Sequence, residues 1–251
     1  MASTNLSRTL SSGSATTKFT YSVWLKYSGF VSGGQRWFSA IGTGDTYFRF
    51  NEDGTMEVSG HNSSASSAGY FITNRRFNDR SSWYHIVIRF DSTESSASNR
   101  LRLYVNGVQQ ESFSTYTDVN SGATDNINLS GNTQYVGGAA SSQYFNGLMS
   151  HINYCDGYSY APTEFGETDS TTGQWKLKPT VSVTYGDNGF FILKNSNSVT
   201  DQSGKGNNFA VANGTFTDAK DCPDNVFATW NASIGNMDTL TNGNTTVARS
   251  G

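Results

Sequence analysis

The sequence predicts an all-β protein: an antiparallel β-sandwich with a β-rich C-terminal extension. Residues 83–91 and 100–106 alternate apolar and polar side chains, which is the pattern of half-buried strands whose successive side chains point to opposite faces. Charged residues make up 15% of the chain, well under the roughly 25% of an ordinary soluble domain. Glycine, serine, threonine and asparagine fill the difference, and aromatic residues reach 14%. Such a composition is typical of short strands joined by tight turns around an aromatic core.

A hairpin between residues 83 and 110 organises this prediction. One side of residues 83–91 carries Tyr84, Ile86, Ile88 and Phe90, so we expect this side to face the core. The other side is expected to face solvent and carries Trp83, His85, Val87 and Arg89. After residues 100–106 the pair Asn106-Gly107 tolerates the positive φ of a type I′ turn, and residues 92–99 read as a surface loop. Three consecutive antiparallel strands are therefore predicted.

The other elements follow in chain order. Residues 1–18 are expected to hold an edge strand and a loop, and further strands are predicted at 19–27, 36–42, 46–51, 55–59, 69–74, 135–138, 144–154, 188–193, 209–211 and 226–230. Residues 116–133 are expected to be a long loop with weak strand character. Residues 156–180 show no strand pattern, although Pro162 favours one helical turn and Trp175 is expected to pin the connection to the sandwich. No helix of normal length is predicted.

Three regions result from this reading. Residues 1–160 form the sandwich, and 161–232 form an irregular connection with closing strands packed on it. Residues 233–251 are polar and are expected to be a flexible tail or a linker to a following domain. Whether the natural chain continues past residue 251 is left open.

The net charge and the lack of targeting signals argue against several classes of protein. A formal net charge of −3 without a basic face argues against a nucleic-acid-binding protein, and no apolar run is long enough for membrane insertion. The N-terminus lacks the apolar segment of a secretory signal, so we expect synthesis in a cytoplasm. Cys155 and Cys222 are then expected to be buried free thiols, with a disulfide bridge as the alternative.

Several stretches carry a family resemblance. Residues 19–26 (FTYSVWLK), 101–107 (LRLYVNG) and 144–154 (YFNGLMSHINY) resemble the concanavalin A-like jelly roll in its laminin-G or pentraxin-like form. A narrower resemblance covers about residues 7 to 232. There SRTLSS, NGLMSHINYCDG, APTEFGETDSTTGQWKLKP, YGDNGFFI, DQSGKGNNF and CPDNVFATWN follow, in order, a module of structural proteins from tailed bacteriophages of marine hosts.

This resemblance implies a virion component, made in the host cytoplasm, that is not an enzyme. Its implied partners are other virion proteins of the capsid or tail, and it is expected to be a homo-oligomer. Two roles remain open: adhesion to host-surface glycans on a tail fibre or spike, and capsid head decoration without specific glycan recognition. A glycosidase or a free cellular lectin is the alternative of another class, and a secreted lectin would need the missing signal.

Glycosidase chemistry requires a pair of carboxyl groups. Retaining hydrolysis needs two carboxyl groups about 5 Å apart, one as nucleophile and one as acid. Glu52 and Asp53 with Glu57 straddle the predicted Asp53-Gly54 turn, and Glu164, Glu167 and Asp169 lie in the irregular connection. Neither group has strand spacing, so no catalytic residue is assigned.

Metal sites are similarly weakly indicated. The laminin-G resemblance implies calcium held by loop oxygens, for which the candidates are Asp45, Asp118, Asp125, Asp201 and Asp221. These residues show no fixed spacing and are expected to form turns, and no zinc motif occurs. We therefore expect no cofactor, with calcium possible but unsupported by a clear motif.

The candidate ligand-binding residues are His85, Arg89 and Arg102. If Asp91 faces Arg100, the hairpin register places Arg89 opposite Arg102, and two like charges on a wet face indicate an anion or sugar site. The alternative is a carboxylate from a neighbouring strand, or splayed, solvated side chains. Aromatic residues that could stack on sugars, without a site assigned from them, are Trp24, Trp37, Tyr47 and Tyr144. The basic run at residues 75–80 favours a solvated turn over a phosphate or sialic-acid site.

Overall fold

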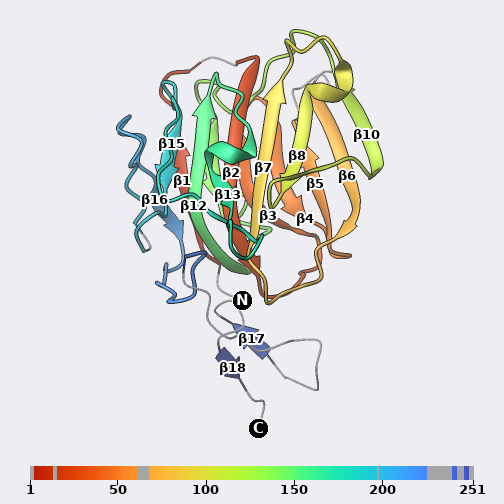
Figure 1. The fold of residues 1–251 in the computed structure, drawn as a ribbon. Helices are drawn as coiled ribbons and strands as arrows, with labels where there is room; N and C mark the ends of the chain where they lie inside the picture. The colour runs from red at the N-terminus through yellow and green to blue at the C-terminus, as the bar shows by residue number, and fades with distance from the viewer. Residues whose placement is uncertain are drawn as a thin grey trace.

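The computed structural model describes residues 3–13, 16–60, 68–196, 198–224, 239–241 and 246–248. Two antiparallel sheets pack face to face, which confirms the predicted all-β sandwich (Figure 1). One sheet has six strands in the order β15-β12-β2-β7-β8-β9, and the other has eight in the order β10-β6-β5-β4-β3-β11-β1-β16. Within the described residues, the helical segments are two short 3-10 turns, Ala97–Asn99 and Pro162–Glu164. None of the helical segments described is long and apolar enough to cross a membrane.

The strand bounds follow the alternation closely. The six-stranded sheet consists of β2 (Lys18–Tyr27), β7 (Tyr84–Asp91), β8 (Leu101–Val105), β9 (Val108–Gln110), β12 (Gly147–Asp156) and β15 (Phe190–Ile192). The eight-stranded sheet consists of β1 (Asn5–Thr9), β3 (Gln35–Ile41), β4 (Asp45–Phe50), β5 (Thr55–Ser59), β6 (Ala68–Arg76), β10 (Phe113–Val119), β11 (Thr133–Val136) and β16 (Ala210–Asn213).

The main core lies between the sheets and is aromatic. On one strand, Phe19 and Tyr21 are buried and stack against Phe90, Phe38 and Phe48 from neighbouring strands and the opposite sheet. Alternate β7 side chains, Tyr84, Ile86, Ile88 and Phe90, point into this core as predicted. Large rings dominate because each buries much apolar surface for few rotatable bonds.

The predicted hairpin register is confirmed. Ile88 pairs with Leu103 and Arg89 with Arg102, and the Asn106 N–H donates to the His85 carbonyl over 2.8 Å. Asn106 and Gly107 have φ of 50° and 78°, as a type I′ turn requires. Gly107 has a second reason to be glycine, since a Cβ there would lie 2.5 Å from the Trp175 ring.

Three expectations need correction, and the tail also contains a described pair of strands. Strand β10 occupies Phe113–Val119, where a loop from residue 116 was expected. The connection at 156–180 contains a hairpin of β13 (Gly166–Thr168) and β14 (Trp175–Leu177), which are too short to show periodicity. The first strand is not at an edge, because β1 lies between β11 and β16. The tail contains a further hairpin of β17 (Thr239–Thr241) and β18 (Thr246–Ala248), and the strand predicted at 226–230 lies outside the described residues.

The C-terminal extension, by which we mean the described residues from 161 onwards, contributes strands to both sheets and also covers one of them. Strand β15 pairs with β12, and β16 pairs with β1 at the end of the other sheet. Phe209 and Phe190 pack edge to face inside the main core, with centroids 4.8 Å apart and an interplanar angle of 70°. In Figure 1 the β13 segment and its flanking loops run across the outside of the six-stranded sheet. The outward side of that sheet is therefore largely covered over β2, β7 and β12, whereas β8 and β9 remain partly exposed.

Candidate functional site

The predicted ligand residue His85 is buried beneath the extension. Its side chain is fully buried and is stacked between Trp24 (4.7 Å) and Trp175 (5.9 Å). Both ring nitrogens are engaged, since Trp175 Nε1 donates to Nδ1 over 2.9 Å and Nε2 lies 2.9 Å from Ser22 Oγ. Desolvation lowers the pKa of His85 to about 3, so the ring is neutral. The expectation that this side chain lies on a wet face is wrong.

The two predicted arginines lie at the margin of the same covered surface. Arg89 Nε donates to Ser159 Oγ over 2.6 Å, and its Nη2 reaches Glu94 Oε1 at 3.1 Å. The carboxylate that pairs with Arg89 therefore comes from the loop after β7 and not from a neighbouring strand, which was the expected alternative. Arg102 is half-buried opposite Arg89, and its Nε has no hydrogen-bond partner. The three predicted residues thus share one sheet face, but the extension packs on it.

We call this outward side of the six-stranded sheet the covered face. Its apolar contacts with the extension join Val87 and Cys155 to Phe165, Tyr185 and Phe191, and a second cluster joins Trp24 and Trp83 to Leu177. At its far side Lys26 and Asp221 form a fully buried ion pair of 2.7 Å. Trp83 Nε1 donates to the other oxygen of Asp221 over 3.0 Å. Trp175 pins the connection here, as predicted.

The acidic calcium candidates are dispersed and engaged in structural bonds. Asp125 is buried, accepts from Thr16 and from the Ile127 N–H, and has a pKa raised by burial to about 6. Asp201 accepts from several backbone N–H groups of its own loop and of β15. Asp221 pairs with Lys26, Asp45 pairs with Arg36, and Asp118 is exposed. Across the described ranges, no group of three or more His, Cys, Asp or Glu residues could hold a metal ion.

The cysteines are free thiols, as expected, although only Cys155 is fully buried and Cys222 is half-buried. Of the aromatic candidates, Trp24 and Trp37 are core residues. Tyr144 is half-buried beside Gly138, where a Cβ would lie 3.2 Å from its ring. Tyr47 alone among the four belongs to the surface described next.

The outward side of the eight-stranded sheet, which we call the open face, carries an ordered polar array. Its centre is Tyr47, whose ring lies between two guanidinium groups: Arg36 at 4.2 Å and Arg49 at 5.1 Å from the centroid. Arg36 forms a bidentate pair with Asp45, with distances of 2.7 and 2.8 Å. These side chains point outward because Asp45, Tyr47 and Arg49 alternate along β4 with residues that face the core.

Glu57 anchors this array from the next strand. Its side chain is only 3% exposed, and it accepts from Arg49 Nε and Nη2 (2.9 and 2.6 Å) and from the Tyr47 hydroxyl (2.6 Å). Burial and the adjacent carboxylate raise the pKa of Tyr47, so its hydroxyl remains a hydrogen-bond donor. Charge-assisted bonds of this kind hold side chains in fixed positions before any ligand arrives.

A cleft of about 690 Å³ adjoins this array and shares Arg49 with it. Its walls offer amides, hydroxyls, carboxylates and guanidinium groups, contributed by Asn51, Glu52, Asp53, Thr55, Asn74, Arg76 and Ser114. The exposed Gly33 and the buried Gly34 form one border, and the Gly33 N–H donates to Glu52 Oε1 over 2.8 Å. The volume lies within the roughly 300–1,000 Å³ of small-molecule sites.

The sequence carried only a partial signal for this site. The sequence indicates Tyr47 only as a stacking residue and Asp45 only as a metal ligand. In the structure Asp45, Tyr47 and Arg49 share one side of β4, and Glu57 lies opposite Arg49 on β5. The missing information was which sheet face the extension leaves uncovered. Arg76, from the basic run at 75–80, lines the cleft and lies 3.6 Å from Asp53.

Comparisons with known proteins agree with this architecture. Residues 3–164 match the laminin-G-type model described as the concanavalin A-like lectin/glucanases superfamily. Among solved structures, a SAP-like pentraxin from Limulus polyphemus is similar at 19% identity and a TM-score of 0.43, covering 64% of this chain and 73% of that one.

Two further structures are similar over smaller shares. Domain 4 of AbnA, a GH43 arabinanase from Geobacillus stearothermophilus solved with arabinotriose, has 16% identity and a TM-score of 0.37, covering 60% of this chain and 65% of that one. A Trypanosoma rangeli sialidase has 15% identity and a TM-score of 0.39, covering 58% of this chain and 22% of that one. No curated protein sequence matches. Because the family model spans most of the sandwich and more than half of the chain, the protein belongs to the concanavalin A-like lectin/glucanases superfamily.

Proposed function

We propose that this protein is a non-enzymatic, glycan-binding module of a bacteriophage virion, and that the open face of its eight-stranded sheet holds the glycan. The observation that carries the binding role is the rigid array of Arg36, Tyr47, Arg49 and Glu57 beside the 690 Å³ cleft. The family membership supports a carbohydrate-binding type of fold, and the virion role rests on the phage-module resemblance alone.

The chemistry of the cleft favours a neutral, hydroxyl-rich ligand. Sugar hydroxyls both donate and accept, and the walls offer both functions through Asn51, Asn74 and the carboxylates Glu52 and Asp53. Positive and negative groups are balanced, because Arg49 is paired with Glu57 and Arg76 lies beside Asp53. A ligand with a large net charge would therefore gain little here.

On a virion, several copies of the module would bind together and strengthen the weak binding of each copy. Several copies in a trimeric fibre or spike engage neighbouring glycans, and avidity then exceeds single-site affinity by about 10²–10⁴. The role of a head-decoration protein without specific glycan recognition remains the competing proposal, with the sandwich serving attachment to the capsid.

The binding role is tested by screening the purified protein on an array of neutral oligosaccharides, followed by titration of any binder. Asn74→Ala and Arg76→Ala remove exposed cleft groups and should each weaken binding about tenfold without lowering Tm. Lys176→Ala, on the opposite side of the sandwich, is the matched surface control. Binding that is unaffected by both cleft variants would contradict the proposed site.

The virion role is tested separately by antibody labelling of intact phage particles. Label confined to the tail supports a receptor-binding component, and label spread over the head supports decoration. Particles that carry no label would contradict the virion role while leaving the glycan site intact.

A further inference from the structure

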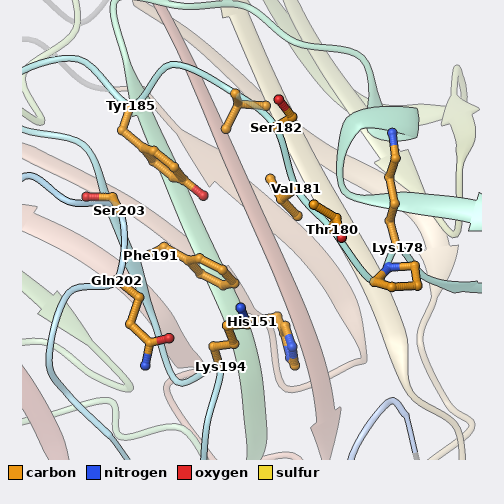
Figure 2. Close-up of a pocket in the computed structure, with 12 residues that line it drawn as sticks. His151, Lys178, Thr180, Val181, Ser182, Tyr185, Phe191, Lys194, Gln202 and Ser203 are labelled. Atoms are coloured by element: carbon orange, nitrogen blue, oxygen red, sulfur yellow. The ribbon is translucent and has the colours of Figure 1, made fainter.

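A second pocket lies on the opposite side of the molecule and is built almost entirely by the extension. It has a volume of about 410 Å³ and lies between residues 178–185 on one side and β12, β15 and the loop at 202–203 on the other (Figure 2). Its lining residues are His151, Lys178, Pro179, Thr180, Val181, Ser182, Val183, Tyr185, Phe191, Lys194, Gln202 and Ser203. Only His151 belongs to the part of the chain that matches the family model.

One wall of the pocket is aromatic. The rings of Tyr185 and Phe191 are nearly parallel, with an interplanar angle of 12° and centroids 6.4 Å apart. Figure 2 shows both side chains beside the pocket, with Val181 across from them. The Tyr185 hydroxyl is fixed by donation to Asn153 Oδ1 over 2.7 Å. An apolar wall of this kind can pack against the ring of a sugar while the polar rim binds its substituents.

The charged groups of the pocket are one-sided. Lys178 and Lys194 line it, and none of its twelve lining residues is Asp or Glu. Burial lowers the pKa of His151, which disfavours the charged form of that ring. Lys194 Nζ lies 5.6 Å from the centroid of Phe191, which places a cation next to the aromatic wall. Lys178 Nζ donates to the Thr163 carbonyl over 3.0 Å and lies 3.9 Å from Glu164, so it contributes mainly its stem.

Two acidic residues, Asp201 and Asp224, lie near the pocket but do not line it. Asp201 is buried behind the loop and accepts from the N–H groups of Phe191, Ser203 and Asn207 and from the Ser203 hydroxyl. Asp224 acts on His151 at longer range. Neither Asp201 nor Asp224 lines the pocket, so a negative group that entered would meet Lys194 as the closest full charge.

The backbone around the pocket is held in an unfavourable conformation. Five non-glycine residues have positive φ in the described ranges. One of them, His151 (49°), lines the pocket, and two others, Leu193 (55°) and Ser196 (58°), flank the lining residue Lys194 in the sequence. His151 occupies an irregularity in the β12–β2 register between Ser150 and Asn153, and its N–H donates to the Leu193 carbonyl over 3.0 Å. Such outliers cluster at functional sites, where they redirect side chains.

We infer that this pocket binds an anionic sugar residue, a pyranose bearing a carboxylate or a sulfate, independently of the neutral-glycan site on the open face. The sugar ring packs on Phe191 and Tyr185. Its negative group pairs with Lys194, and the side chains of Gln202 and Ser203 bind its hydroxyls.

The test is a set of titrations of the full chain with matched oligosaccharides of equal length: neutral, uronic-acid-containing and sulfated. We expect at least tenfold tighter binding of one or both acidic forms and a marked loss of that preference between 50 and about 300 mM salt, since partly exposed charges are screened over roughly 10 Å. Tighter binding of the carboxylated form alone or of the sulfated form alone identifies the anion.

Variants locate the site. Lys194→Gln should weaken acidic-sugar binding about tenfold and leave neutral-glycan binding unchanged. Lys205→Gln removes an exposed lysine from the neighbouring loop without touching the pocket and should change neither. Equal affinity for neutral and acidic ligands, or equal losses in the two variants, would overturn the inference. Neither result bears on the open face, whose test uses neutral sugars.

Discussion

The two outward faces of the sandwich have opposite chemistry for one reason. On the covered face, His85 and Val87 are fully buried because the connection at 157–185 and the segment around Asp221 lie over them. On the open face, Tyr47 and Arg49 occupy equivalent alternate positions but remain partly exposed. They are held by a hydrogen bond and an ion pair to Glu57 rather than by a covering layer. Strand alternation thus identifies two faces, whereas the rest of the chain decides which one can reach a ligand.

The largest expected effect tests whether the covered face is internal. Val87→Asp should abolish folding or cost about 4 kcal/mol or more, because it buries an unpaired charge under the extension. Ile86→Asp, whose side chain points to the core, should be equally severe. Val108→Asp is the matched control, since Val108 is 65% exposed and should leave Tm nearly unchanged. A folded Val87→Asp protein with wild-type Tm would contradict the covered face.

The next effect concerns the ion pair that ties the end of the extension to β2. Asp221→Ala removes the carboxylate that pairs with Lys26 inside the protein and should destabilise the fold by about 3–5 kcal/mol. Asp187→Ala, at an exposed pair of 4.0 Å, should not change the urea midpoint. Equal midpoints for the two variants would show that Asp221 does not anchor the extension.

A smaller effect follows from the neutral His85. Its folded pKa of about 3 lies below the ordinary 6.5, so the unfolded chain binds the extra proton and stability falls as pH drops from 6.5 towards 3. This group contributes a loss of up to about 1.4 kcal/mol per pH unit over that window. Asp125 acts in the opposite direction, because its pKa is raised to about 6 and the folded state holds the proton.

The His85→Gln variant isolates this contribution, since Asp125 is present in both proteins. Denaturant unfolding at several pH values between 4.5 and 7 should give a shallower slope for the variant than for the wild type. His151→Gln serves as the control at a half-buried histidine and should change the slope less. Identical slopes for wild type and His85→Gln would mean that His85 is not buried in its neutral form.

Local patterns made most of the fold predictable. The register that places Arg89 opposite Arg102 depends on a short hairpin and a two-residue turn, both visible in residues 83–110. The burial of His85 depends on Trp175, ninety positions away, and alternation contains no information about that contact. Strands β15 and β16 have three or four residues each and pair with strands that are distant in the sequence, β12 and β1.

The candidate site was predictable in part for the same reason. The sequence indicates that Tyr47 could stack on a sugar, but it gives no structural role to Glu57, which lacks the spacing of a catalytic carboxylate. The structure shows that role, because the register places Glu57 opposite Arg49 on the adjacent strand. Arg36 joins them through a bulge in the β3–β4 pairing, which sequence spacing does not reveal.

The central claim is that neutral glycans reach the open face and not the covered one, and site-directed blocking tests it most directly. Single cysteines at Asn74 on the open face and at Lys176 above the covered face, in a Cys222→Ser background, would each be coupled to a bulky maleimide. The binding of one neutral oligosaccharide would then be titrated. We predict that the label at position 74 abolishes binding and that the label at position 176 leaves it intact. Binding that survives the label at 74 and is lost with the label at 176 would contradict the account.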